Sequence, residues 1–154
     1  MKIILIEDNE HKRKKIKDFI NNLDKDILIE EAYSYTSGLK KCLDNIFDLL
    51  IIDMTMPTYD KSSSESGGRF RTYGGKEIIR QLKRKNKEIP FVVVSQYSKF
   101  SENNETLSLE EIAEQLNNIS QEFYIDTLLY DTSSSNWKIL LENILTREKI
   151  KWKF

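Results

Sequence analysis

FDLLIIDMTMP, residues 47–57, is the most informative stretch of this sequence. Four apolar residues, Leu49 to Ile52, follow one another and end on the carboxylate of Asp53. A short continuous apolar run is typical of a strand that is buried on both faces, as in a parallel sheet covered by helices. An aspartate directly after such a strand lies at the edge of the sheet where parallel α/β folds bind their ligands. The stretch therefore predicts a buried strand and a candidate functional carboxylate.

Apolar runs and amphipathic helical patterns alternate along the rest of the chain. Besides 47–53, strands are predicted at 2–7, 27–33, 91–95 and 127–131, and helices at 11–23, 38–46, 76–85, 109–119 and 136–145. Strand and helix thus alternate five times, which favours a parallel sheet with helices on both faces. The right-handed crossover rule leaves few topologies for such a chain. We predict an α/β fold, (βα)5, with a doubly wound five-stranded parallel sheet in the flavodoxin-like strand order 2-1-3-4-5.

The bulk composition is that of a soluble globular protein. Hydrophobic residues make up 39% and charged residues 32% of the 154 residues, and this length suits one domain, which we expect to span 1–154. Two segments, at about 58–75 and 96–106, are predicted to be long loops. Loops of this length in a compact domain tend to be functional or disordered.

Charge and cysteine content exclude several classes of function. The 24 Lys and Arg balance the 25 Asp and Glu, so no global field favours nucleic acid or an anionic membrane as partner. Cys42 is the only cysteine, which excludes an internal disulfide and a multi-cysteine zinc site and fits a reducing compartment. No apolar run is long enough for a signal-peptide core or a membrane helix. We therefore expect a cytoplasmic protein.

Polar residues close several of the predicted strands. Glu7 and Asp8 follow the first strand, Asp53 the third, and Ser95 ends the fourth. Because carboxylates that converge on one sheet edge repel one another, a cation is expected among them, and Mg²⁺ is the divalent ion that prefers such oxygen ligands. A site of this kind prepares Asp53 to attack a phosphoryl group as a nucleophile. For Asp8, followed by Asn9, the alternative is a turn or a helix N-cap.

These features resemble the response-regulator receiver domain. The acidic pair Glu7-Asp8 closes the first strand, and Asp53 closes the third with Pro57 four residues later. A hydroxyl residue, Ser95, closes the fourth strand. The resemblance extends through all five βα units, and it lies in the order of these features rather than in any single motif.

The resemblance implies a phosphorylation site and its metal ligands. Asp53 would accept a phosphoryl group from a sensor histidine kinase or a histidine phosphotransfer protein of a two-component system. Asp8, Asp53 and the backbone carbonyl of Thr55 would bind Mg²⁺, with Glu7 acting through water. Ser95 would hydrogen-bond the phosphoryl group. A stand-alone receiver of this kind is no enzyme beyond its own phosphorylation and dephosphorylation, so the expected output is contact with a downstream protein target.

The sequence departs from the family at three positions. Receivers close the fifth strand with a lysine that contacts the phosphoryl oxygens, and here that position falls on Tyr130. Thr127 replaces the usual aromatic three residues earlier, and Gln96 replaces the small residue after the fourth strand. Because an arginine presents a fork of donors suited to phosphate, we hypothesise that Arg69 or Arg71 takes the place of the lysine.

Two alternatives to a working receiver remain open. The first is a pseudo-receiver that is never phosphorylated and binds a protein partner constitutively. The second is a Mg²⁺-dependent phosphotransfer enzyme of the Toprim kind, which needs a D-x-D motif where this chain has D-M-T at 53–55. A phosphatase of the haloacid-dehalogenase kind also needs a D-x-D motif, on the first strand, and this chain lacks it there.

Charged and aromatic residues at the ends of the chain carry further expectations. The basic run HKRKK, 11–15, is expected to be the solvated face of the first helix, or else a docking face for a kinase or phosphotransfer protein. His11, the only histidine, is expected to be solvated too. Trp152 and Phe154 are expected to pack back on the domain.

Overall fold

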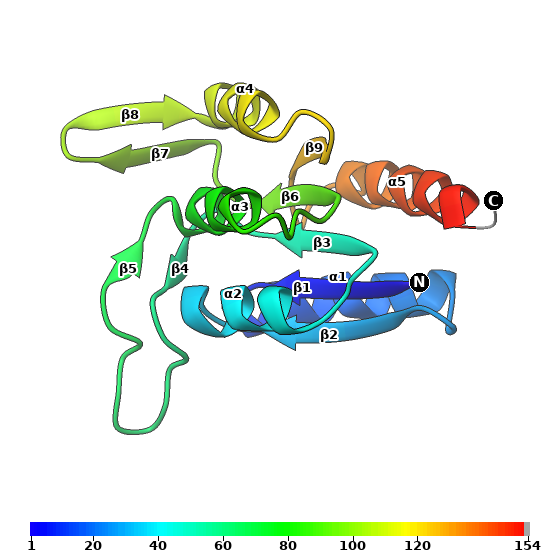
Figure 1. The fold of residues 1–154 in the computed structure, drawn as a ribbon, viewed down its shortest axis with the longest axis horizontal. Helices are drawn as coiled ribbons and strands as arrows, with labels where there is room; N and C mark the ends of the chain where they lie inside the picture. Colours follow the sequence, from blue (N-terminus) through cyan, green and yellow to red (C-terminus); the bar gives the residue numbers. More distant parts are fainter. Residues whose placement is uncertain (153–154) are drawn as a thin grey trace.

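A five-stranded parallel sheet forms the centre of the protein, described here by a computed structural model covering residues 1–152. Its strands are β1 (Lys2–Ile6), β2 (Leu28–Ala32), β3 (Leu49–Ile52), β6 (Phe91–Ser95) and β9 (Tyr124–Leu129). They lie in the order β2-β1-β3-β6-β9, which is the predicted order 2-1-3-4-5 (Figure 1). The predicted fold class is therefore confirmed.

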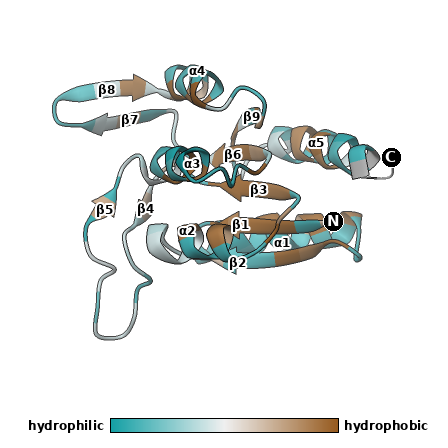
Figure 2. Ribbon diagram, in the orientation of Figure 1, coloured by the Kyte–Doolittle hydropathy of each residue, from teal (hydrophilic) through white to brown (hydrophobic). Residues whose placement is uncertain are grey.

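Helices cover both faces of this sheet. The elements on one face are α1 (Glu10–Leu23) and α5 (Asn136–Trp152), and those on the other are α2 (Tyr35–Asp44), α3 (Gly74–Arg84) and α4 (Leu109–Ile119). Side chains that alternate along β1 enter two cores: Ile3 packs with α1 and α5, and Ile4 with the other three helices. Because both faces are buried, the central strands are apolar throughout, as the hydropathy colours show (Figure 2). None of the helices in the described residues is long and apolar enough to cross a bilayer.

Some predicted boundaries are corrected by local contacts. The second helix begins at Tyr35, because Ser34 is its N-cap and accepts a hydrogen bond from the Ser37 amide. It ends at Asp44, which leaves Ile46 exposed. The fifth sheet strand begins at Tyr124, three residues before its predicted start. The ring of Tyr124 packs edge-on against Phe91 of β6 and holds these residues on the sheet. The predicted packing of the Trp152 and Phe154 side chains lies outside the described part of the chain.

Each of the two segments predicted as long loops contains residues of a paired strand. β4 (Met56–Pro57) pairs with β5 (Phe70–Arg71), which leaves 58–69 as the connecting loop. The segment 96–106 is not a loop as predicted, because β7 (Lys99–Glu102) and β8 (Glu105–Ser108) form an antiparallel hairpin. Asn103 and Asn104 adopt φ of 52° and 65° at its turn, as a two-residue hairpin connection of the favoured twist requires. Both ribbons lie on the side of the molecule to which β1, β3 and β6 point (Figure 1).

Candidate functional site

Three carboxylates meet where β1 and β3 end. The parallel pairing of the two strands sets Ile6 opposite Ile52, so the residues that follow them are neighbours. One oxygen each from Glu7, Asp8 and Asp53 lies within 4.8 Å of the others. Glu7 and Asp53 are almost fully buried, at 1% and 3% exposure, whereas Asp8 is partly open to solvent. The structure thus brings together the three acids that the sequence placed at one sheet edge.

An ammonium group lies among these carboxylates. Lys12, in the first turn of α1, places its Nζ 2.5 Å from Glu7 Oε1 and 3.2 Å from Asp53 Oδ2. The same Nζ donates hydrogen bonds to the carbonyl of Val94, at 2.6 Å, and to Gln96 Oε1, at 2.8 Å. The Lys12 residue is only 2% exposed. A buried ammonium therefore joins α1, β1, β3 and the end of β6 at one point.

The electrostatics of the site still favour more positive charge. Burial, and then repulsion by Asp53, raises the pKa of Glu7 to about 8. Burial also raises the pKa of Asp53, and the Lys12 ammonium opposes that rise. Glu7 Oε1 is buried, and its close polar contact is the Lys12 ammonium at 2.5 Å. The raised pKa values of both buried carboxyls mean that the site favours bound protons, and a divalent cation would favour the ionised carboxylates in their place.

The residues present fit a magnesium ion. Mg²⁺ prefers carboxylate, carbonyl and water oxygens, and it is bound in proteins through one or two carboxylates. Asp8 is the most open of the three acids, and Asp53 turns Oδ2 toward the site while Oδ1 accepts a hydrogen bond of 2.7 Å from the Met54 amide. The cluster is therefore consistent with a receiver Mg²⁺ site.

The backbone after Asp53 is held by the start of α3. The Gly75 amide donates to the Met54 carbonyl at 2.8 Å. A Cβ on Gly75 would lie 2.3 Å from the Asp53 carbonyl oxygen, so only glycine allows this approach. Nearby, the Thr55 hydroxyl donates to the Thr72 carbonyl at 3.0 Å. These contacts fix the main chain that carries Asp53 and the predicted Thr55 ligand.

Ser95 lies at the end of β6 and is fully buried. Its Oγ donates to the Tyr97 carbonyl at 3.0 Å and accepts from the Tyr97 amide at 3.1 Å. Its hydroxyl is therefore bonded within its own turn in this structure, and its contact with a phosphoryl group stays a prediction. Tyr97 leads directly into the β7–β8 hairpin, so Ser95 connects the sheet edge to that hairpin.

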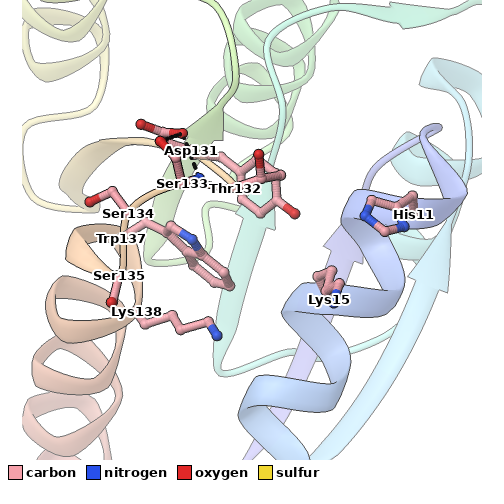
Figure 3. A pocket seen from close by; sticks show the side chains of 10 residues that line it. His11, Lys15, Asp131, Thr132, Ser133, Ser134, Ser135, Trp137 and Lys138 are labelled. Atoms are coloured by element: carbon pink, nitrogen blue, oxygen red, sulfur yellow. Dashed lines mark hydrogen bonds between the residues drawn. The ribbon is translucent and has the colours of Figure 1, made fainter.

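Tyr130 follows β9 and lies beside the ammonium. Its amide donates to the Ser95 carbonyl at 2.7 Å, and its ring centroid lies 5.8 Å from Lys12 Nζ. Tyr130 and Lys12 line a cavity of about 310 Å³. The other lining residues are Asn9, His11, Gln96, Asp131 and Thr132. A second pocket of about 300 Å³ adjoins it, between α1 and the start of α5; His11 and Lys15 reach toward it from one side and Trp137 and Lys138 from the other (Figure 3). Lys12 and Tyr130 thus border open space between α1 and the segment after β9.

Lys12 is the site residue that the sequence reasoning missed. The run 11–15 was expected to be a solvated face, and this is wrong for Lys12, although His11, Lys14 and Lys15 are exposed. The signal was helical spacing: Lys12, Ile16 and Ile20 are at i, i+4 and i+8, and all three are buried. Lys12 thus extends the apolar stripe by one turn toward the sheet edge. The helix N-cap is Asn9 rather than Asp8, which leaves the Asp8 carboxylate for the site.

The structure does not place the hypothesised arginines at the site. The Arg71 guanidinium donates to Glu77 at 2.6 Å and lies over the ring of Tyr35, 4.1 Å from its centroid. Arg69 is exposed, and its carbonyl accepts hydrogen bonds from Thr58. The 58–69 loop does provide one long ion pair to the site, between Lys61 Nζ and Asp8 Oδ2 at 4.0 Å. The cation that the arginine hypothesis expected near Asp53 is instead the ammonium of Lys12.

Comparison with known proteins agrees with this geometry. The family model of the response regulator receiver domain matches residues 3–113, a range that contains Glu7, Asp8, Asp53 and Ser95. The chain is 28% identical over 140 residues to the Detocs response regulatory protein DtcB of Enterobacter cloacae (strain JD6301), covering 90% of this chain and 93% of that protein. It is 22% identical over 145 residues to the uncharacterized protein y4jR of Sinorhizobium fredii, covering 93% and 95%.

Solved structures share the fold. The CheY-like response regulator receiver domain protein from Methanospirillum hungatei superposes with a TM-score of 0.64 at 16% identity, covering 99% of this chain and 96% of that one. The response regulator TrrA from Thermotoga maritima, solved in complex with Mg²⁺-BeF, gives 0.60 at 18% identity, covering 94% and 96%. At such low identity, these two structures support only the fold. The family model matches residues 3–113, which is most of the sequence, and therefore supports membership of the family. The chain belongs to the response-regulator receiver domain family.

Proposed function

We propose that this receiver is phosphorylated on Asp53 by a sensor histidine kinase or a histidine phosphotransfer protein. The observation that carries the proposal is the position of the Asp53 carboxylate, which lies after β3 within 4.8 Å of the Glu7 and Asp8 oxygens. Burial raises its pKa and an ammonium lies 3.2 Å from Oδ2. A carboxylate in such a site is oriented and supplied with positive charge, the two things that phosphoryl transfer needs.

The reaction would form an acyl phosphate. An oxygen of the Asp53 carboxylate attacks the phosphorus of the donor's phosphoimidazole. The nitrogen–phosphorus bond breaks, and its electron pair stays on the imidazole nitrogen. Asp8, Asp53 and the Thr55 carbonyl would hold Mg²⁺, with Glu7 acting through water; when bound, this ion neutralises charge on the transferring oxygens. Ser95 would give up its bond to the Tyr97 carbonyl and donate to a phosphoryl oxygen instead.

The output of the proposed receiver is contact with a protein. The β7–β8 hairpin starts two residues beyond Tyr97, the residue that binds Ser95, so a change at the acceptor reaches a projecting surface through few bonds. We infer that residues 1–154 act as one receiver unit. Similarity to a response regulatory protein of a Detocs system supports a role in signalling. The Toprim-like and dehalogenase-like alternatives each need a D-x-D motif that this sequence lacks at the required position.

A pseudo-receiver remains the second candidate because of two observations. Tyr130 occupies the position of the usual lysine, and the Lys12 ammonium already pairs with the acceptor carboxylate. A protein with this charge balance could bind a partner without any phosphoryl group.

Incubation with Mg²⁺ and acetyl phosphate, followed by intact mass spectrometry, distinguishes the two candidates. The phosphorylation proposal predicts the mass gain of one phosphoryl group in the wild type, its loss in Asp53→Asn, and its persistence in Asp18→Asn. Asp18 is a matched control because it is an exposed aspartate on α1 that pairs only with Lys14 among the ion pairs of the described residues. A wild type that gains no mass from acetyl phosphate or from a histidine kinase would favour the pseudo-receiver.

A further inference from the structure

We propose that Lys12, from α1, is the residue that contacts the phosphoryl oxygens on Asp53, in the role that a lysine after the last sheet strand would otherwise fill. The proposal rests on the phosphorylation of Asp53 proposed above. It starts from the ammonium itself: Nζ lies 3.2 Å from Asp53 Oδ2 and 2.5 Å from Glu7 Oε1, with 3% of the lysine side chain exposed. No other lysine or arginine in the described residues forms an ion pair with Asp53.

The buried position of the Lys12 ammonium is energetically unfavourable in itself, which points to a functional role. Burying a charged group costs free energy that only close partners offset. A cation in the first turn of a helix also opposes the helix dipole, and Lys12 is three residues after the N-cap Asn9. The methylene chain of a lysine can also carry the ammonium out to water, as it does for the exposed Lys14 of the same helix. Lys12 instead reaches inward to the acceptor.

Two departures from the family support the inference, because the side chains of Gln96 and Tyr130 both contact or lie close to the Lys12 ammonium. Gln96 replaces a small residue, and its Oε1 accepts a hydrogen bond of 2.8 Å from Lys12 Nζ. Tyr130 replaces the lysine after the last sheet strand, and its ring lies 5.8 Å from the same Nζ. A second lysine at position 130 would place two ammonium groups side by side, which like-charge repulsion disfavours. The exchange of residues at 96 and 130 and the inward turn of Lys12 therefore form one rearrangement.

Lys12 contacts both the acceptor carboxylate and a cavity. With Gln96 and Tyr130 it lines a cavity of about 310 Å³, and its Nζ lies 3.2 Å from Asp53 Oδ2. As the bond from the Asp53 oxygen to phosphorus forms and the donor bond breaks, negative charge leaves the carboxylate and gathers on the phosphoryl oxygens. The ammonium exchanges its contact with Asp53 for one with a phosphoryl oxygen. This contact strengthens as the charge develops, which is the condition for lowering the barrier.

Phosphorylation kinetics of lysine variants test this inference. We expect Lys12→Met to lower the initial rate of Asp53 phosphorylation by acetyl phosphate with Mg²⁺ by at least about tenfold, since loss of one charge-stabilising donor commonly costs this much or more. Lys12→Arg, which keeps the charge, should retain more of the rate. Lys14→Met is the control, because Lys14 is an exposed lysine of the same helix, and it should leave the rate unchanged. Equal rates in Lys12→Met and wild type would overturn the inference and leave the phosphorylation of Asp53 intact.

A second measurement leaves Lys12 itself unchanged. In protein labelled with ¹⁵N-lysine, the Lys12 ammonium should give a protected NMR signal, because its Nζ is buried. Addition of Mg²⁺ and beryllofluoride should shift this signal in the wild type and not in Asp53→Asn. A Lys12 signal that stays unchanged while amides around Asp53 shift would contradict the inference. If nothing shifts in the wild type, beryllofluoride does not bind, and the proposed function fails instead.

Discussion

The Lys12 ammonium and the Asp53 carboxylate form a buried ion pair, 3.2 Å from Nζ to Oδ2, that links the first turn of α1 to the end of β3. Glu7 lies on the other side of the same ammonium, at 2.5 Å. One internal cation thus serves two buried acids, while the third acid, Asp8, is left partly open to solvent. The site is thus divided into a lysine side and a solvent side.

Magnesium should bind on the side of Asp8. We expect a titration of the unphosphorylated protein, followed through NMR shifts of the amides near Asp53, to show weak binding in the wild type. Asp8→Ala should weaken it by about tenfold or more, as expected for loss of a direct ligand. Asp18→Asn should bind like the wild type. Equal titration curves for Asp8→Ala and wild type would place the metal elsewhere.

Phosphorylation should loosen the base of the β7–β8 hairpin. Ser95 Oγ now donates to the Tyr97 carbonyl, and that bond is lost if the hydroxyl turns to a phosphoryl oxygen. Tyr97 packs edge-on against Phe100 of β7, with ring centroids 6.4 Å apart, so the change continues into the hairpin. Hydrogen exchange of the amides at 97–108 should therefore speed up with Mg²⁺ and beryllofluoride.

Two serine variants separate this coupling from general flexibility. Ser95→Ala should remove the difference between the free and the beryllofluoride-bound protein. Ser101→Ala, which removes only the hairpin's exposed bond between Ser101 and Thr106, should keep it. A hairpin that responds equally in Ser95→Ala would show that the signal takes another route.

Gly75 should tolerate no larger residue. A Cβ there would lie 2.3 Å from the Asp53 carbonyl oxygen, which is backbone and cannot move aside. At the neighbouring Gly74, a Cβ would approach Met56 Cγ at 2.8 Å, which is part of a flexible side chain. We expect Gly75→Ala to lower the free energy of unfolding by roughly 1–3 kcal/mol or more, as overpacking does, and Gly74→Ala to lower it less. Urea unfolding of both variants measures this, and equal losses would contradict it.

The predictions from sequence succeeded where a pattern depends on neighbours in the chain. The run Leu49 to Ile52 is apolar because the strand is buried on both faces, so both the strand and the position of Asp53 could be read directly. Sheet order followed from the alternation of strand and helix, because crossover chirality leaves few arrangements. The meeting of Glu7, Asp8 and Asp53 followed in turn from that order.

The predictions missed features that depend on where a long side chain goes. Lys12 reads as solvated because lysine usually is, and its direction is decided by Asp53, Glu7 and the Val94 carbonyl, which come from three other segments. The hairpin was missed because its only strong signal is the pair Asn103-Asn104. Half of the residues in its strands, KFSE and ETLS, are exposed, and the strands show little apolar alternation.

Cys42 should make the protein less stable in alkaline solution. Burial raises the pKa of its thiol from 9.0 to about 12, so above pH 9 the unfolded chain releases this proton while the folded protein keeps it. The stability from this group is complete below pH 9 and is lost progressively between pH 9 and 12. Relative to Cys42→Ala, the wild type should lose about 1.4 kcal/mol in free energy of unfolding between pH 7 and 10. A difference between the two proteins that does not change with pH would contradict the buried, protonated thiol.

Borohydride reduction of the phosphorylated protein locates the phosphoryl group most directly. Borohydride converts an aspartyl phosphate to homoserine, which tandem mass spectrometry of the digested protein then assigns to one residue. After incubation with Mg²⁺ and acetyl phosphate, we expect homoserine at position 53, none at Asp8 or Asp48, and none anywhere in the Asp53→Asn variant. Homoserine at another aspartate, or a phosphorylated protein that yields none at position 53, would contradict the assignment of Asp53 as acceptor.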